Sequence, residues 1–264
     1  MKSTFKSPIG IFDSGVGGTS IWKEIHQLLP NEDTIYLADS KYAPYGEKSK
    51  EEIIHLSIKN TEYLLNKNCK IIVVACNTAT TNAISHLREK YKVPFIGIEP
   101  AIKPASLNTT TNNIGILATR GTLNSLLFAT TSNKLNDEIN IIEQVGEGLV
   151  ELIECNQLHS LEMTNLLEKH LSVFSKFNID YLVLGCTHYP YLIPQIQKIL
   201  GDKITIIDSG QAVARQTKKV LEKNDLLNIN SEKRNTQFYI NTNKRVLEDI
   251  LNTNKKMQID FLDF

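Results

Sequence analysis

The two halves of the sequence repeat one pattern, and this repeat restricts the fold more than any single motif does. In the first half, the apolar segment 8–12 is followed by a second apolar segment, 70–75, which ends at Cys76. In the second half, the apolar segment 114–118 is followed at a similar interval by a segment that ends at Cys186. Self-similarity on this scale predicts two similar lobes, each with a cysteine at the end of a strand.

Apolar segments alternate with helical patterns along both halves, as they do in α/β proteins. Residues 70–75 are apolar almost throughout, which is typical of a strand in a parallel sheet that is covered on both faces. We therefore predict an α/β fold of two similar lobes, each with a mainly parallel sheet covered by helices. A pseudo-twofold axis would relate the lobes, with the active site in the cleft between them. Helices are predicted over 161–177 and 192–200, whereas the tail 261–264 carries no signal.

The composition argues against several classes of protein. Hydrophobic residues make up 41% and charged residues 22% of the chain, as in globular proteins. Lys and Arg together number 29, as do Asp and Glu, so no net charge favours nucleic acid or an anionic membrane. No apolar run approaches the roughly 18 residues that span a bilayer. Residues 1–6 lack the apolar core of a signal peptide.

The four cysteines are too few for a disulfide framework, which indicates reduced thiols and a cytoplasmic protein. No cysteines or histidines stand at the spacing of a zinc site, so no metal is predicted. No lysine stands in a motif typical of pyridoxal phosphate enzymes, and no cofactor is predicted.

Two strand-end thiols that face one cleft would suit an inversion of configuration. One thiolate would remove a proton from a carbon atom, and the thiol on the opposite side would deliver another. Asp13 is a candidate to assist Cys76, whereas Cys186 has His188 two residues on and Glu154 to orient that histidine. A redox pair normally comes as CxxC, and a nucleophile needs one thiol only. Two unrelated buried cysteines are the simplest alternative.

A glycine-rich turn, residues 13–18, lies between the first strand and a helix predicted over 19–29. Strand, turn and helix resemble a phosphate-binding loop, but GxGxxG and a Walker lysine are both missing and Asp13 would repel a phosphate. The turn is predicted to bring backbone N–H groups and the side chains of Asp13 and Ser14 to a small ligand. Alternatively, the glycines only make a tight turn.

Neutral polar residues gather at the predicted strand ends and loops. They offer hydroxyl, amide and backbone groups, which can hold carboxylates and an ammonium group. Each of them taken singly is equally well explained as a turn or cap residue. The residues of this kind are Ser14, Tyr45, Gly46, Asn77, Thr78, Thr119 and Thr187.

Four motifs stand at these positions: DSGVGG at 13–18, PYG at 44–46, CNTA at 76–79 and GCTHYP at 185–190. Together they resemble glutamate racemase, of the cofactor-independent aspartate/glutamate racemase superfamily, and the resemblance runs from about residue 9 to residue 222. It implies that the chain interconverts L- and D-glutamate and supplies D-glutamate for peptidoglycan. The implied partner is a small-molecule substrate, glutamate, with no nucleic acid and no membrane, and a homodimer is expected.

The resemblance also implies roles for the matched residues. Cys76 and Cys186 would be the two bases, assisted by Asp13, His188 and Glu154. Two lobes are implied, one made of residues 1–98 with 210–264 and the other of residues 99–209. The residues expected to bind substrate are Asp13, Ser14, Tyr45, Gly46, Asn77, Thr78, Thr187 and His188, and the strand-end argument adds Thr119.

Some alternatives stay open at this point. Many members of the family have a proline-containing stretch before the assisting glutamate, whereas this chain reads GLVELIE at 148–154, so Glu151 is an alternative to Glu154. Other possible functions are an aspartate racemase, a ligand-binding protein that keeps the racemase fold, and a hydrolase that uses Cys186 with His188.

Overall fold

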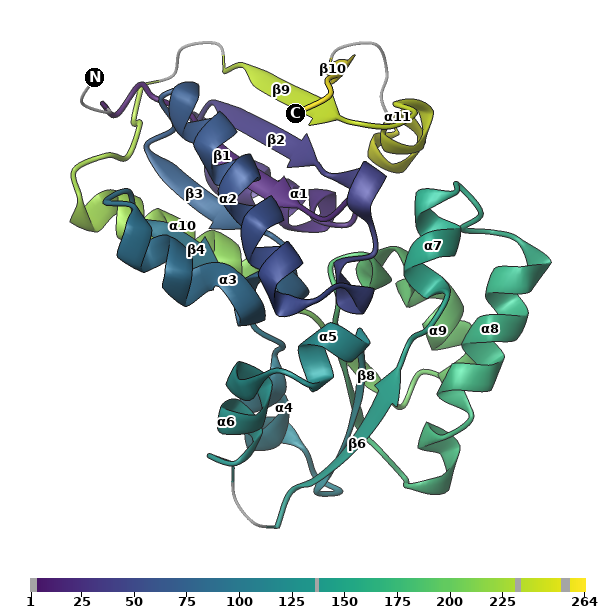
Figure 1. Ribbon diagram of the computed structural model, residues 1–264. Coiled ribbons are helices and arrows are strands. Elements are labelled where there is room, and N and C mark those ends of the chain that lie inside the picture. The colour runs from purple at the N-terminus through teal and green to yellow at the C-terminus, as the bar shows by residue number, and fades with distance from the viewer. Residues whose placement is uncertain (1–3, 136–137, 231–233, 253–256) are drawn as a thin grey trace.

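The computed structural model describes residues 4–135, 138–230, 234–252 and 257–264. It consists of two lobes, the upper and lower halves of Figure 1. The chain builds most of the upper lobe first, passes into the lower lobe at residues 98–101, and returns to the upper lobe with α10.

The first lobe contains a sheet in which every strand pairs in parallel, in the order β10-β9-β2-β1-β3-β4. All residues of β1, β2 and β3 are buried, which explains why these segments are apolar on both faces. The bounds are β1 Ile9–Asp13, β2 Thr34–Ala38, β3 Ile71–Val74, β4 Phe95–Gly97, β9 Thr236–Ile240 and β10 Gln258–Phe261.

The second lobe contains a smaller parallel sheet, in the order β6-β5-β7-β8. Its strands are β5 Asn113–Ala118, β6 Asn140–Val145, β7 Tyr181–Gly185 and β8 Thr205–Ile207.

The two sheets share one strand order, which confirms the predicted α/β fold of two similar lobes. β1 lies between β2 and β3, as β5 lies between β6 and β7, and β4 and β8 follow at corresponding edges. Phe12 pairs with Val74 in the first sheet, and Ala118 pairs with Gly185 in the second. Cys76 and Cys186 therefore follow topologically equivalent strands.

Helices cover both faces of the larger sheet. Residues of α2 and α3 pack with Phe12 and Val74 in one buried cluster, whereas residues of α1 and α10 pack with Ile9 and Ile11 in another. Helix α2 begins with a capping box, in which Ser49 and Glu52 each accept the other's backbone N–H. The helices of this lobe are α1 Thr19–Leu28, α2 Lys50–Asn66, α3 Asn77–Lys90, α10 Gly210–Lys223 and α11 Arg245–Leu251, with 3-10 helices at Ser40–Tyr42 and Tyr45–Glu47.

The second lobe has shorter helices around its sheet. They are α4 Ile102–Asn108, α5 Arg120–Leu123, α6 Leu126–Ser132, α7 Leu149–Glu154, α8 Leu161–Leu171 and α9 Ile193–Leu200, with 3-10 helices at Phe174–Lys176 and Tyr189–Leu192. Within the described ranges, no helix combines the length and the apolar character that crossing a bilayer requires.

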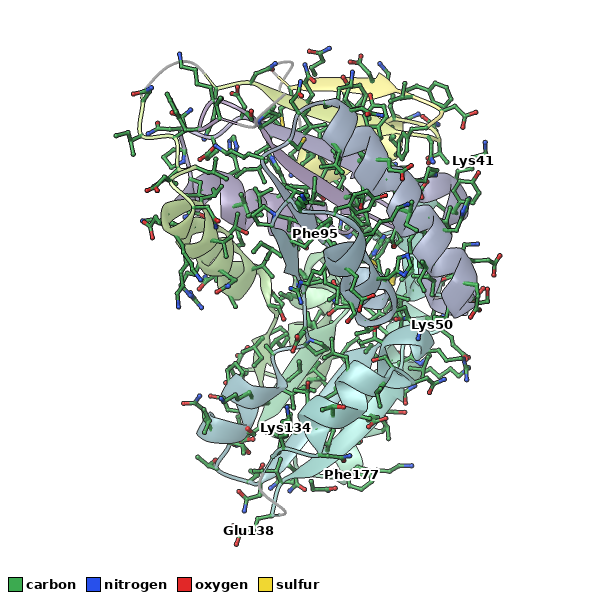
Figure 2. All side chains as sticks on the ribbon, turned by 60° about the vertical axis from the view of Figure 1, so that its left-hand side comes forward. Lys41, Lys50, Phe95, Lys134, Glu138 and Phe177 are labelled. Carbon is green, nitrogen blue, oxygen red and sulfur yellow. The ribbon has the colours of Figure 1, made fainter. Side chains whose placement is uncertain are left out.

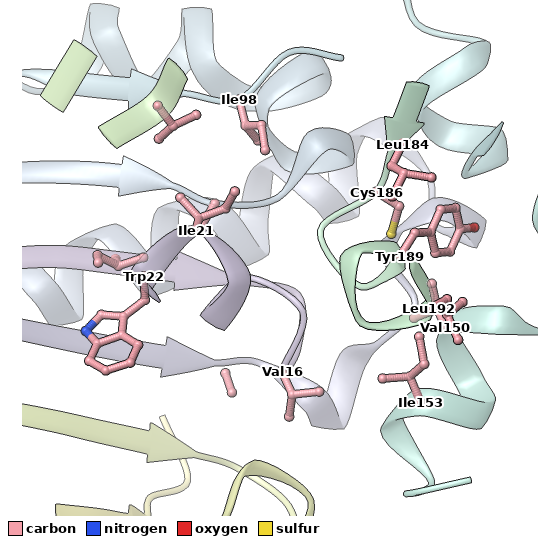
Figure 3. Close-up of a cluster of buried hydrophobic side chains, with 14 of the residues drawn as sticks. Val16, Ile21, Trp22, Ile98, Val150, Ile153, Leu184, Cys186, Tyr189 and Leu192 are labelled. Carbon is pink, nitrogen blue, oxygen red and sulfur yellow. The ribbon is translucent and has the colours of Figure 1, made fainter. Parts of the chain in front are cut away.

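One hydrophobic cluster extends across the boundary between the lobes. It includes Val16 and Ile21 from the first lobe together with Val150, Ile153 and Leu184 from the second (Figure 3). The cluster gives the lobes a shared apolar contact next to Cys186, which belongs to it. Charged side chains such as those of Lys41, Lys50 and Lys134 lie on the outer surface instead (Figure 2).

Three segments differ from the sequence-based prediction. Helix α8 ends at Leu171, and a separate 3-10 turn carries Phe174 into the core against Gly115. The helix predicted over 192–200 begins at Ile193, because Tyr189–Leu192 forms a 3-10 turn first. Strand β10 was not predicted, because it is an edge strand in which Ile259 alone is buried and no apolar pattern arises.

Candidate active site

Cys76 and Cys186 lie at the carboxyl ends of their sheets, which is where α/β proteins bind ligands. Cys76 is the N-cap of α3, and Cys186 directly follows β7. Both line one small pocket. The other lining residues are Ser14, Pro44, Tyr45, Gly46, Asn77, Thr78, Thr119, Val150, Gly185, Thr187 and His188.

Cys76 is connected to Asp13 through the hydroxyl group of Ser14. Cys76 Sγ donates to Ser14 Oγ at 3.5 Å, and Ser14 Oγ donates to Asp13 Oδ1 at 3.4 Å. Burial, followed by the nearby charge of Asp13, raises the pKa of the Cys76 thiol, whereas the hydrogen bonds with Ser14 and with the Ala79 N–H act in the opposite direction. Cys76 is therefore held as a neutral thiol, the form that can give a proton.

The carboxyl group of Asp13 lies behind Ser14 and does not line the pocket. Its burial raises its pKa to about 6, although the charge of His188 and the Gly18 N–H, which donates at 2.7 Å, both lower it. The Thr187 hydroxyl of the second lobe lies 3.4 Å from both carboxyl oxygens. A pKa close to neutrality lets Asp13 exchange protons at physiological pH.

Cys186 is connected to Glu154 through the imidazole of His188. His188 Nδ1 lies 3.7 Å from Cys186 Sγ, and His188 Nε2 lies 2.5 Å from Glu154 Oε1. Burial lowers the pKa of His188, but the hydrogen bonds with Cys186 and Glu154 raise it, and the net pKa lies well above the usual value. A protonated His188 can donate one hydrogen bond to the sulfur and the other to the carboxylate.

Two contacts compete at His188 Nε2, and together they indicate that this nitrogen carries a proton. The N–H of Gly17 points at Nε2 from 3.3 Å, which would require Nε2 to accept. Glu154 Oε1 is much closer, and a carboxylate oxygen can only accept. The shorter, charge-assisted contact therefore fixes a proton on Nε2.

Glu154, and not Glu151, reaches His188. Glu154 Oε1 also accepts the Val16 N–H at 2.7 Å, and Oε2 accepts the Ser40 hydroxyl at 2.7 Å. Glu151 lies almost one turn earlier on α7 and lines two neighbouring pockets.

The glycine-rich turn after β1 accommodates the second lobe. A Cβ on Gly15 would overlap the Glu154 carboxylate, and a Cβ on Gly17 would overlap the His188 ring. The prediction that the backbone N–H groups of this turn face a small ligand is therefore wrong for residues 16–18. Those N–H groups face Glu154 Oε1, His188 Nε2 and Asp13 Oδ2 respectively.

A buried carboxylate, Asp39, anchors the pocket loop that carries Tyr45 and Gly46. Tyr45 donates its hydroxyl proton to Asp39 Oδ2 at 2.5 Å. Asp39 was not among the predicted site residues, although it directly follows β2 at the same end of the sheet as Asp13 and Cys76. The further donors to Asp39 are Lys59 Nζ at 3.0 Å, Asn60 Nδ2 at 3.1 Å and Asn241 Nδ2 at 2.6 Å.

The remaining polar lining combines linked hydroxyl groups with one unpaired amide oxygen. Thr78 Oγ1 lies 2.9 Å from Thr119 Oγ1, and Thr119 caps α5. Asn77 Oδ1 is buried and has no hydrogen-bond partner among the described residues. A buried acceptor without a partner is unfavourable, so it would gain from a donor on a bound molecule. In the same described ranges, no three His, Cys, Asp or Glu side chains gather as metal ligands would.

Residues 9–217 match the family model for Asp/Glu/hydantoin racemases. A glutamate racemase from Ectopseudomonas mendocina is 45% identical over 84% of this chain and 85% of its own length. Two solved structures are similar over 98% of both chains. They are a glutamate racemase isoform from Bacillus anthracis, at 31% identity and a TM-score of 0.87, and the glutamate racemase from Francisella tularensis in complex with D-glutamate, at 32% and 0.84.

Proposed function

The chain belongs to the Asp/Glu/hydantoin racemase family, and from this premise we propose that it interconverts L- and D-glutamate by proton transfer between two cysteines. One observation carries the proposal. Cys76 and Cys186 line the same pocket from equivalent strand ends of two similar sheets. Each thiol has a carboxyl group behind it, connected through one intervening side chain.

In the proposed reaction, one cysteine thiolate takes the proton from the α carbon of glutamate. The electron pair of the broken C–H bond passes into the α-carboxylate, and the opposite cysteine gives its S–H proton to the other face of the carbon. The product is the opposite enantiomer, and the two cysteines have exchanged protonation states. Proton exchange through Ser14 and Asp13 on one side, and through His188 and Glu154 on the other, would restore them.

The proposed substrate contacts use groups that lie in the pocket lining. Asn77 Oδ1, buried and without a partner among the described residues, would accept a hydrogen bond from the substrate ammonium group. The hydroxyls of Ser14, Thr78, Thr119 and Thr187, with Tyr45 and Gly46, would surround the two carboxylates.

We further propose that the enzyme works in the cytoplasm, where thiols stay reduced, and that its D-glutamate enters peptidoglycan. A homodimer is the oligomeric state that we expect, and light scattering coupled to gel filtration would test it. We assign residues 1–98 with 210–264 to the first lobe and residues 99–209 to the second, in keeping with the membership of the two sheets.

The deciding experiment follows both enantiomers of glutamate by chiral chromatography, with no cofactor added and in deuterium oxide. We expect L-glutamate to approach an equal mixture, with solvent deuterium appearing on the inverted molecules. Cys76→Ala and Cys186→Ala should each abolish inversion in both directions. Cys155→Ala is the matched control, because Cys155 is an exposed free cysteine outside the pocket.

The alternatives give different results in the same assay. Inversion of L-aspartate in place of L-glutamate would make the enzyme an aspartate racemase, and an irreversible product would favour a hydrolase that uses Cys186. No turnover at all would favour a binding protein. Normal activity in either pocket variant would contradict the two-cysteine mechanism.

A further inference from the structure

The carboxylate that holds His188 belongs to one lobe but is bound by the other. Glu154 is at the end of α7 in the second lobe, and its side chain is 11% exposed. Among the described residues, it makes three hydrogen bonds, and two of them come from the first lobe, from the Ser40 hydroxyl and the Val16 N–H, each at 2.7 Å. The third partner is His188 of its own lobe.

Ser40 is firmly attached to the first lobe. It follows β2 and begins a 3-10 helix, and its neighbour Asp39 is fully buried. Asp39 accepts hydrogen bonds from α2 and from the segment after β9, so the residues around Ser40 are held by two other segments of the first lobe. Ser40 does not line the pocket that contains the two cysteines.

We propose that Ser40 is a positioning residue, which orients Glu154 toward His188 only when the two lobes are together. This inference rests on the proposed racemase function and deepens it. When the lobes separate, Glu154 loses the Ser40 hydroxyl and the Val16 N–H, and its carboxylate is free to turn away from His188. The acid/base group at Cys186 would therefore be complete only around an enclosed substrate, which limits proton exchange with bulk water.

The charged groups around His188 allow the role of Ser40 to be measured as a change in the pKa of His188. The titratable groups that act on it are Cys186 on its own loop, Glu154 of α7 and Asp13 at the end of β1. Because the bond with Glu154 helps to raise the pKa of His188, a less constrained Glu154 should let His188 lose its proton at a lower pH.

The test compares Ser40→Ala with Ser40→Thr, which keeps the hydroxyl. For Ser40→Ala we expect kcat for glutamate inversion to fall roughly 10- to 100-fold, the range for one hydrogen bond to a charged group, with little change in KM. The alkaline limb of its pH–rate profile should move to lower pH. Ser40→Thr should stay within a few-fold of the parent enzyme.

Ser20→Ala is the matched control, because Ser20 also bonds across the lobes, to the Thr187 carbonyl at 2.9 Å, without touching Glu154. Ser20→Ala should leave the pH–rate profile unchanged. The proposal is wrong if Ser40→Ala keeps the parent rate and profile, or if Ser20→Ala produces the same shift.

A second measurement needs no turnover. Titration of His188, followed by the NMR signals of its ring nitrogens, should give a lower pKa in Ser40→Ala than in the parent protein. An unchanged titration would refute the role of Ser40 even if the protein were a racemase. A lowered pKa in a protein that did not act on glutamate would refute the proposed function and leave the positioning role supported.

Discussion

The α carbon of Gly17 lies so close to the imidazole of His188 that a Cβ at this position would overlap the ring. The two residues come from different lobes and are far apart in sequence. Because Gly17 of the first lobe has no side chain, there is room for the acid/base side chain of His188 from the second lobe.

Gly17→Ala should therefore remove most of the activity while the protein stays folded. The new methyl group would displace His188 from Cys186 and Glu154, so we expect kcat to fall at least tenfold. Chiral chromatography of the products measures the loss, and circular dichroism checks the fold. Gly210→Ala is the control, because the tertiary contacts nearest to its Cβ among the described residues would be side-chain atoms of Asp208 and Glu24 at 3.0 Å.

Asp13→Asn should make the protein more stable at neutral pH and inactive. The folded pKa of Asp13 is raised from 3.8 to about 6, so the folded state binds a proton that the unfolded state releases. The parent protein then loses stability as the pH rises from about 4 to about 6, by roughly 3 kcal/mol. Urea unfolding at pH 4 and pH 7 should give a stability advantage of Asp13→Asn that is larger at pH 7. An equal difference at both pH values would contradict the raised pKa.

Asp180→Asn, in contrast to Asp13→Asn, should make the protein less stable at neutral pH. Burial raises the pKa of Asp180, but the donors in residues 109–111 lower it by more, to about 2. A lowered folded pKa stabilises the protein above pH 4, and this contribution is lost as the pH falls from about 4 to about 2. The midpoint of urea unfolding should therefore be lower in the variant than in the parent protein at pH 7, and this difference in midpoint should become smaller at pH 2.5. The same difference at both pH values would show that Asp180 acts only through packing.

Tyr45→Phe should weaken substrate binding more than it slows the chemical step. The variant keeps the ring but loses the hydrogen bond that fastens the pocket loop to Asp39. We expect KM for glutamate to rise several-fold, with kcat within a few-fold of the parent enzyme. Tyr63→Phe, at a tyrosine outside the pocket, is the control. A fall in kcat with unchanged KM would indicate that Tyr45 acts on the chemistry and not on the loop.

Much of the fold could be predicted because its signals are local. The apolar segments that became β1, β3, β5 and β7 are buried on both faces, and their repetition along the chain indicated two matching sheets. Strand β10 gave no such signal, because only Ile259 of this edge strand is buried.

The site residues that lie at the ends of strands could be predicted from the sequence. Cys76, Asp13 and Cys186 lie at the ends of strands, and so does Asp39, which was not among the predicted residues. The choice between Glu151 and Glu154 depends on which of them faces the other lobe, and spacing along the chain carries no information on this. For the same reason, the sequence did not reveal Ser40, or that Gly15 and Gly17 make room for Glu154 and His188.

The position of β9 has a consequence for how the protein is made. This strand pairs with β2, and Asn241 just after it holds Asp39 of the pocket loop, yet every strand of the second lobe precedes it in the sequence. On the ribosome, the second lobe can therefore fold while the edge of β2 is still open. Catalytic competence would then appear late in synthesis, when Asn241 has left the exit tunnel and closes the larger lobe.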